Sequence, residues 1–259
     1  MSDDRSLELE VEVPGTPEEV WRAIATGPGI SSWYVPHTVE ERAGGVATAS
    51  FGAAPEMQIT GRVSAWDPPH RVVFDGGDTG SGLAFEWLVE ARDGGSCVVR
   101  LVNTGFGSGE EWDAQYEGMA EGWQLFLLNL KLHLTHFAGA SAKAMLPTAM
   151  WTGPRAQTWS DLTAALGLPA APAVNDRVVV VSDGAPALAG TVADVAPWRL
   201  ALVVDEPAPG TALVAVEGIS DQVRVSIWSY LYGPEGAAAV DRDESPWQQW
   251  LDERAAPPS

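Results

Sequence analysis

The chain has 259 residues, a formal net charge of −20 and hydrophobic residues at 46% of its positions. This apolar fraction is enough for a packed core and excludes a largely disordered chain. A strongly acidic protein lacks a general electrostatic footprint for nucleic acid or for an anionic membrane, so we expect neither as a partner. The length allows one large domain or two ordinary ones.

Cysteine usage and the N-terminus narrow the class of protein further. Cys97 is the single cysteine, which excludes an intrachain disulfide and a cysteine metal cluster, and its strand-like surroundings predict a buried small hydrophobe. The N-terminus lacks the basic and then apolar pattern of a signal peptide, and no apolar run reaches the roughly 18 residues of a membrane span, so we expect a cytoplasmic protein. Without a nucleophile elbow, a P-loop or a dinucleotide fingerprint, we assign no catalytic residue, no metal and no cofactor.

The first quarter of the chain predicts a strand followed by a helix. Residues 7–13 alternate apolar and acidic side chains, which is typical of a half-buried strand. Thr16 then suits a helix N-cap and Pro17 the first helical position. Five β-rich runs separated by Gly, Pro and Asp turns come next and predict an antiparallel meander: 45–51, 57–66, 71–75, 83–91 and 97–104.

Residues 110–137 contain both a strand-like and a helix-like hydrophobic pattern. Residues 128–134 alternate as in a strand, but an apolar residue recurs every three or four positions for about seven turns, so we predict one long helix. His133 and His136 near its end are expected to be surface residues that stabilise the helix dipole. Gly118 and Gly122 leave a strip without side chains, which would widen a pocket or let a sheet approach closely.

The second half repeats landmarks of the first in the same order. "GRVSAWDPPHRVVF" at 61–74 is echoed by "GTVADVAPWRLAL" at 190–202. We therefore predict a first domain at 1–139, a linker at 140–147 and a shortened second copy at 148–259 that ends in a short helix. A different α+β domain at 148–259 is the alternative.

Four segments carry a resemblance to a known family: "VPGTPEEVWRAI", "SSWYVP", "GRVSAWDPPHRVVF" and "EGWQLFLLNLKLHL". Together they resemble the START-like superfamily, also called SRPBCC, and within it the homologues of the C-terminal domain of the heat-shock-protein-90 (Hsp90) ATPase activator. The resemblance covers about residues 7–138. It implies an α+β helix-grip fold, in which a curved antiparallel sheet surrounds a long C-terminal helix.

The resemblance also implies a cavity between sheet and helix for an apolar or aromatic guest. The residues expected to line it combine one face of the strands with one face of the helix: Trp33, Met57, Ile59, Phe85, Trp87, Tyr116, Met119, Trp123, Leu127 and Leu130. The competing interpretation is that these large side chains fill the core and leave no cavity.

The expected function is noncatalytic binding of a hydrophobic small molecule. One alternative is a co-chaperone or protein-interaction module with a chaperone as partner, although only six residues precede the first strand and we expect no further domain there. The other is a polyketide cyclase-like enzyme, which needs a buried acid–base pair that the sequence does not single out. We also expect the two halves to associate as a pseudo-dimer.

Overall fold

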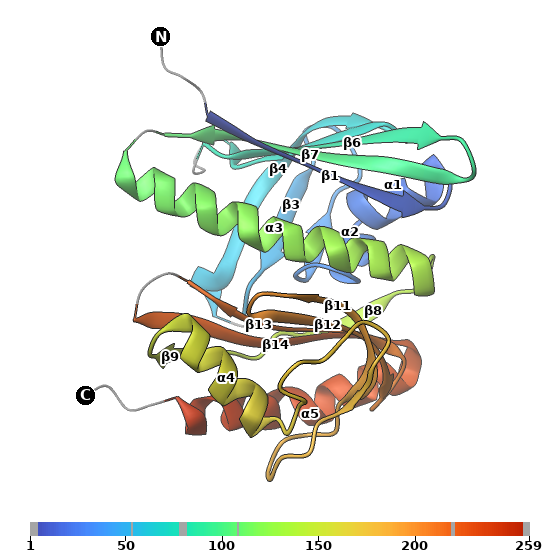
Figure 1. Ribbon diagram of the computed structural model, residues 1–259. Coiled ribbons are helices and arrows are strands. Elements are labelled where there is room, and N and C mark those ends of the chain that lie inside the picture. Colours follow the sequence, from blue (N-terminus) through green and yellow to red (C-terminus); the bar gives the residue numbers. More distant parts are fainter. Residues whose placement is uncertain (1–4, 53, 78–81, 108, 219–220, 256–259) are drawn as a thin grey trace. The chain divides into compact units, whose positions relative to one another are not determined.

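The structure, a computed structural model, describes residues 5–52, 54–77, 82–107, 109–218 and 221–255. The chain divides into two compact units, Met1–Ser141 and Ala142–Ser259, each with its own seven-stranded antiparallel sheet (Figure 1).

In the first unit the strands are ordered β1-β7-β6-β5-β4-β3-β2, which places the first strand beside the last. Their bounds are β1 Arg5–Pro14, β2 His37–Val39, β3 Val46–Ser50, β4 Gln58–Asp67, β5 Arg71–Asp75, β6 Ala84–Arg92 and β7 Ser96–Phe106. The five predicted β-rich runs thus correspond to β3 through β7. A 3-10 turn, Pro55–Met57, precedes β4.

Three helices accompany this sheet. Helix α1 spans Pro17–Ala25 and begins with a capping box in which Thr16 and Glu19 satisfy each other's backbone N–H groups. Helix α2 spans Gly27–Ser31. Helix α3 spans Glu110–His136 and lies across one face of the sheet (Figure 1), so the helical interpretation of 110–137 is confirmed.

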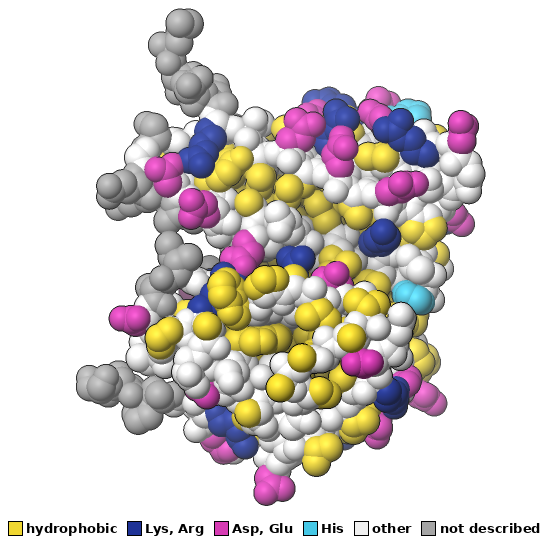
Figure 2. Space-filling view, in the orientation of Figure 1, with side chains coloured by type: hydrophobic (Ala, Val, Ile, Leu, Met, Phe, Trp, Pro, Cys, Tyr) yellow, Lys and Arg dark blue, Asp and Glu magenta, His cyan; other side chains and the backbone are white. Residues whose placement is uncertain are grey.

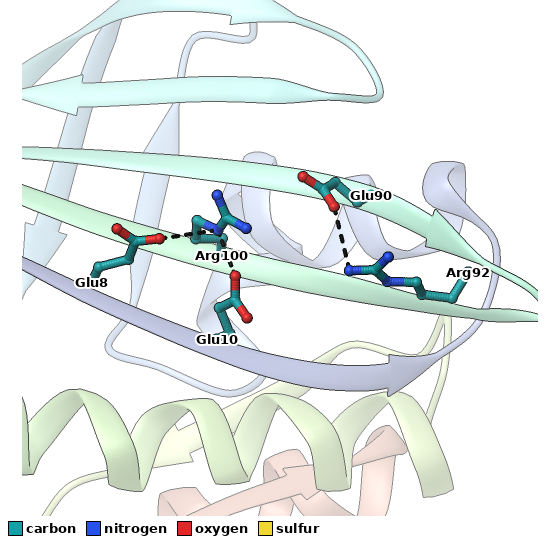
Figure 3. A network of polar contacts seen from close by, with 5 residues as sticks. All are labelled: Glu8, Glu10, Glu90, Arg92 and Arg100. Atoms are coloured by element: carbon teal, nitrogen blue, oxygen red, sulfur yellow. Dashed lines mark hydrogen bonds and ion pairs between the residues drawn. The ribbon is translucent and has the colours of Figure 1, made fainter.

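The two faces of the first sheet differ in character. On β7, Cys97, Val99 and Leu101 are fully buried, as expected for Cys97. The alternate residues face the other way, where Arg100 pairs with Glu8 and Glu10 of β1 (Figure 3). Acidic and basic side chains gather over these strands (Figure 2). The charged face is therefore the solvent face, and the apolar face is left for the helices and for a cavity.

In the second unit the strand order is β10-β11-β12-β13-β14-β8, with β9 also paired to β14. The bounds are β8 Ala142–Met145, β9 Thr148–Thr152, α4 Arg155–Ala165, β10 Arg177–Val179, β11 Ala189–Ala196, β12 Arg199–Glu206, β13 Gly210–Glu217, β14 Gln222–Tyr232 and α5 Gly233–Arg254. A split first strand, a helix, five antiparallel strands and a closing helix repeat the path of the first unit. No counterpart of α2 and β2 occurs among the described residues of the second unit, so this unit is a shortened copy of the fold.

The two copies share a detail at the stretch that repeats in the sequence. In β4 the register shifts between Val63 and Ala65, and in β11 it shifts between Val192 and Asp194. A β-bulge therefore lies three residues after Gly61 in one copy and three residues after Gly190 in the other. Both glycines sit against the neighbouring strand, since a Cβ atom would lie 2.1 Å from the carbonyl oxygen of Asp75 at Gly61 and 2.3 Å from that of Val203 at Gly190. The echo records the same bend and the same close backbone approach.

Two boundary predictions were wrong. The segment predicted as a linker, 140–147, contains β8, which pairs with β14, so the second unit begins at Ala142. The last helix was predicted to be short, with "SPWQQWLDER" as its segment. It has 22 residues, and Pro234 at its start suits the first turn, whereas Pro246 is accommodated inside it.

Two predictions about α3 were also wrong. His133 is 2% exposed and is therefore not a surface residue. At Gly118 and Gly122 an added Cβ would meet nothing within 4 Å, so this strip neither borders the cavity nor receives the sheet.

No helix of the described chain combines the length and apolar character needed to cross a bilayer.

We predict that Gly61→Ala and Gly190→Ala each lower the free energy of unfolding by about 1–3 kcal/mol, because the added methyl group collides with a backbone carbonyl that cannot move independently. The measurement is urea unfolding followed by far-UV circular dichroism. Gly118→Ala is the matched control, because its added methyl group meets open space. This substitution replaces a glycine within a helix and should raise the free energy of unfolding by about 0.5–1 kcal/mol. Equal stability of all three variants would contradict the shared role of the two strand glycines.

Candidate ligand-binding cavity

The first unit encloses a cavity of about 150 Å³. It is bounded by α1 and α2, by the connection into β2, by the apolar face of β3 through β6 and by one residue of α3. Most of the residues that line it are aromatic or aliphatic. The full lining consists of Ile24, Ile30, Trp33, Tyr34, His37, Ala47, Ala49, Phe51, Ile59, Gly61, Arg62, Phe74, Asp75, Gly76, Leu83, Phe85, Trp87 and Trp123. An apolar cavity of this volume has room for about one benzene-sized ring.

Two aromatic residues join the walls of the cavity. The Trp123 ring of α3 lies 5.7 Å from Phe85 and 5.4 Å from Trp87, both on β6. The Tyr34 ring lies 4.9 Å from Trp123 and 4.4 Å from Phe126. These edge-to-face and tilted contacts hold the connection after α2 against the long helix.

The segment that carries Tyr34 is fixed by buried hydrogen bonds. The indole N–H of Trp33 donates to the carbonyl of Ala23 at 2.9 Å, and the side-chain amide of Asn129 donates to the carbonyl of Trp33 at 2.8 Å. Trp33 is fully buried. Because both bonds lie away from water, the segment has little freedom to collapse into the neighbouring space.

Small residues of β3 and β4 create the space of the cavity. Ala47 of β3 lies opposite Gly61 of β4, and the neighbouring pair is Ala49 and Ile59. Three of these four positions carry at most a methyl group where a sheet would ordinarily present branched or aromatic side chains. Ile59 lines the cavity and is also 59% exposed, so the cavity reaches solvent beside it.

The polar groups of the lining come from four residues. Burial raises the pKa of the Tyr34 phenol, which stays protonated at neutral pH. Burial also lowers the pKa of His37 below its ordinary value of 6.5, against the opposing effect of its bond to the Val35 carbonyl. Asp75 is half-buried, which raises its pKa, but hydrogen bonds from the Gly77 N–H and from Ser64, together with the Arg62 guanidinium at 3.0 Å, outweigh burial and lower it. At neutral pH the cavity thus holds a neutral phenol, a neutral imidazole and one paired set of opposite charges.

The structure brings five of the ten predicted lining residues to the cavity: Trp33, Ile59, Phe85, Trp87 and Trp123. The other five do not line it. Met57 ends the 3-10 turn and is 42% exposed, whereas Leu127 and Leu130 are buried in the core. Tyr116 packs on Phe106 and beneath the Arg5 guanidinium, and the Met119 sulfur accepts from Asn103.

Sequence reasoning missed the residues just after Trp33 and those of β5. Tyr34, His37, Phe51, Phe74 and the pair Arg62–Asp75 all line the cavity. The segment "SSWYVP" carried the family resemblance and was the one available signal for Tyr34. Nothing in the sequence indicated that the chain would turn His37 inward two residues after Val35. Among the residues that the structure describes, no group of three His, Cys, Asp or Glu side chains is placed to hold a metal ion.

A curved antiparallel sheet, its first strand beside its last, a helix pair after the first strand and a long closing helix together define a helix-grip domain of the START-like class. Residues 14–135 match the family described as "Activator of Hsp90 ATPase homolog 1-like protein". The N-terminal domain is therefore similar to this family, in line with the resemblance that its sequence carries. An uncharacterized protein of Mycobacterium tuberculosis is 29% identical over 109 residues, which are 39% of this chain and 76% of the relative.

Solved structures give further likenesses. A Bacillus halodurans protein aligns with a TM-score of 0.45 at 18% identity, over 52% of this chain and 99% of its own. Two longer proteins align over nearly the whole chain. DynU16, from the dynemicin biosynthetic locus, has a TM-score of 0.44 at 16% identity over 95% of this chain and 94% of its own. BexL, a di-domain ARO/CYC from the BE-7585A biosynthetic pathway, has a TM-score of 0.43 at 16% identity over 97% and 95%. All three TM-scores lie below 0.5, so the tandem fold is established here by the strand order of each unit.

We predict that Trp33→Phe lowers the free energy of unfolding by about 1–3 kcal/mol, because it leaves the buried Ala23 carbonyl without its donor. Urea unfolding followed by circular dichroism measures the change. Trp112→Phe on α3 is the control, since Trp112 is only partly buried. An equal effect at both positions would contradict a specific role for the Trp33 hydrogen bond.

We predict that His37 titrates below pH 6.5 and His133 near pH 4, because burial disfavours both imidazolium ions. Since each ring binds its proton less readily in the folded than in the unfolded chain, its contribution to stability is complete above pH 6.5 and is lost as pH falls toward the folded pKa. Histidine resonances followed by NMR across pH 4–7.5 test this, with His37→Asn and His133→Asn assigning the signals. A midpoint above 6.5 for either ring contradicts the burial argument.

Proposed function

We propose that the N-terminal domain binds an apolar or aromatic small molecule, about one ring in size, in the cavity bounded by its sheet, α1, α2 and Trp123 of α3. The observation that carries the proposal is an apolar cavity of about 150 Å³ bounded by aromatic side chains that are themselves fixed by neighbouring contacts. A ring that enters exchanges contact with water for contact with apolar walls, which is favourable by roughly 25 cal/mol for each Å² buried. The surrounding indoles supply edge and face contacts to such a guest.

The test uses a substitution that fills part of the cavity. The wild-type chain is titrated with toluene and p-cresol by isothermal calorimetry, and binding of at least one of them is expected. Ala49→Leu places a branched side chain where Ala49 lines the cavity, and we expect it to weaken binding by at least about tenfold because the guest and the new side chain compete for the same space.

Ala91→Leu is the matched control, since it makes the same change at an exposed position near the end of β6. Circular dichroism establishes that both variants fold. Equal binding by the Ala49→Leu variant and the wild type would place the ligand elsewhere, and absence of binding by the wild type would overturn the proposed function.

The match of residues 14–135 to the family described as "Activator of Hsp90 ATPase homolog 1-like protein" favours a second candidate, an interaction with a chaperone of the Hsp90 type. The measurement is the ATPase rate of a purified Hsp90 with increasing amounts of this chain. A rate that rises with saturation supports a co-chaperone role, and an unchanged rate together with no complex in analytical ultracentrifugation counts against it.

A further inference from the structure

Tyr34 and His37 lie side by side in the cavity lining. Their ring centroids are 5.5 Å apart and both residues border the empty space. The remaining walls are mostly hydrocarbon, so what these two side chains offer to a guest depends on which of their polar atoms are already engaged.

The position and tautomer of His37 follow from two hydrogen bonds. Its backbone N–H donates to the Ser31 hydroxyl oxygen at 2.8 Å, which fixes the residue relative to α2. Its Nδ1 lies 2.7 Å from the carbonyl oxygen of Val35. A carbonyl only accepts, so Nδ1 carries the proton and Nε2 of the neutral ring is an acceptor. Burial keeps the ring neutral at pH 7.

The Tyr34 hydroxyl is the second group. Its ring is surrounded by Trp33, Phe51 and Trp123, none of which presents an acceptor to it. Burial keeps this hydroxyl protonated at neutral pH. It therefore retains both a donor and an acceptor function inside an apolar space.

The charged pair in the lining does not supply a free charge for an anionic guest. Arg62 Nε lies 3.0 Å from a carboxylate oxygen of Asp75, which compensates its charge. Because the lining contains a neutral imidazole acceptor and a guanidinium whose charge is compensated, it favours a neutral ligand that donates a hydrogen bond over a carboxylate.

We propose that the cavity selects one-ring phenols, with the ligand hydroxyl donating to Nε2 of His37 and accepting from the hydroxyl of Tyr34. This deepens the proposed function and rests on it, since it requires that a ring occupies the cavity. The phenol is favoured over a plain arene because only the phenol can form hydrogen bonds with the acceptor of His37 and the hydroxyl of Tyr34, two residues that line the cavity.

The test compares p-cresol, toluene and benzoate by isothermal calorimetry on the full chain at pH 7.5. We expect p-cresol to bind about tenfold more tightly than toluene, the effect of one well-formed hydrogen bond, and benzoate to bind more weakly than p-cresol. His37→Asn keeps a donor for the Val35 carbonyl but removes the acceptor at Nε2. It should weaken p-cresol about tenfold and change toluene by less than about twofold. Tyr34→Phe, which removes only the hydroxyl, should act in the same direction.

The matched control is His70→Asn, at an exposed histidine of the turn between β4 and β5. It should leave all affinities unchanged. If toluene binds as tightly as p-cresol, if benzoate binds more tightly than p-cresol, or if His37→Asn weakens both arenes equally, the selection of phenols is overturned while binding in the cavity stands. If the wild type binds none of the three molecules, the proposed function fails as well.

Discussion

The packing of Trp123 against both β6 and Tyr34 is the interaction on which the first domain depends. One indole contacts the sheet at Phe85 and Trp87 and contacts the connection after α2 at Tyr34. A curved sheet and a single helix cannot close on each other without large side chains. Trp123 supplies that closure at one point, and the small residues Ala47 and Gly61 keep the neighbouring volume open. The cavity thus exists because sheet and helix close on each other at Trp123, whereas the small side chains beside that contact leave space unfilled.

The sequence predicted the elements whose pattern is local. The long helix at 110–136 was predictable because its apolar spacing continues for many turns, and the β-rich runs were predictable because each is bounded by turn residues. The last helix was underestimated because Pro246 has the local meaning of a helix start, whereas surrounding packing accommodates it inside a helix. Strand β8 was missed because four residues give too short a pattern to separate from a linker.

The cavity was predictable only in part, for a physical reason. Phe85 and Trp87 lie on a strand, and the alternation of side chains along it reveals which face is buried. They line the cavity, however, only because α3 places Trp123 opposite them. Leu127 and Leu130 share the helix with Trp123 and are equally apolar, yet they pack into the core. Which apolar residue fills space and which borders it is decided by how the elements meet, and no spacing within one element contains that information.

The second domain repeats the bend and the glycine of the first but lacks a counterpart of α2 and β2 among its described residues. In the first domain, Tyr34 lies in the connection between these two elements and His37 begins β2, and both contribute polar groups to the cavity. The second copy of the fold therefore lacks, among its described residues, the segment that borders the cavity of the first. Under the proposed function, the expected stoichiometry is one ring-sized ligand per chain, bound by the first domain.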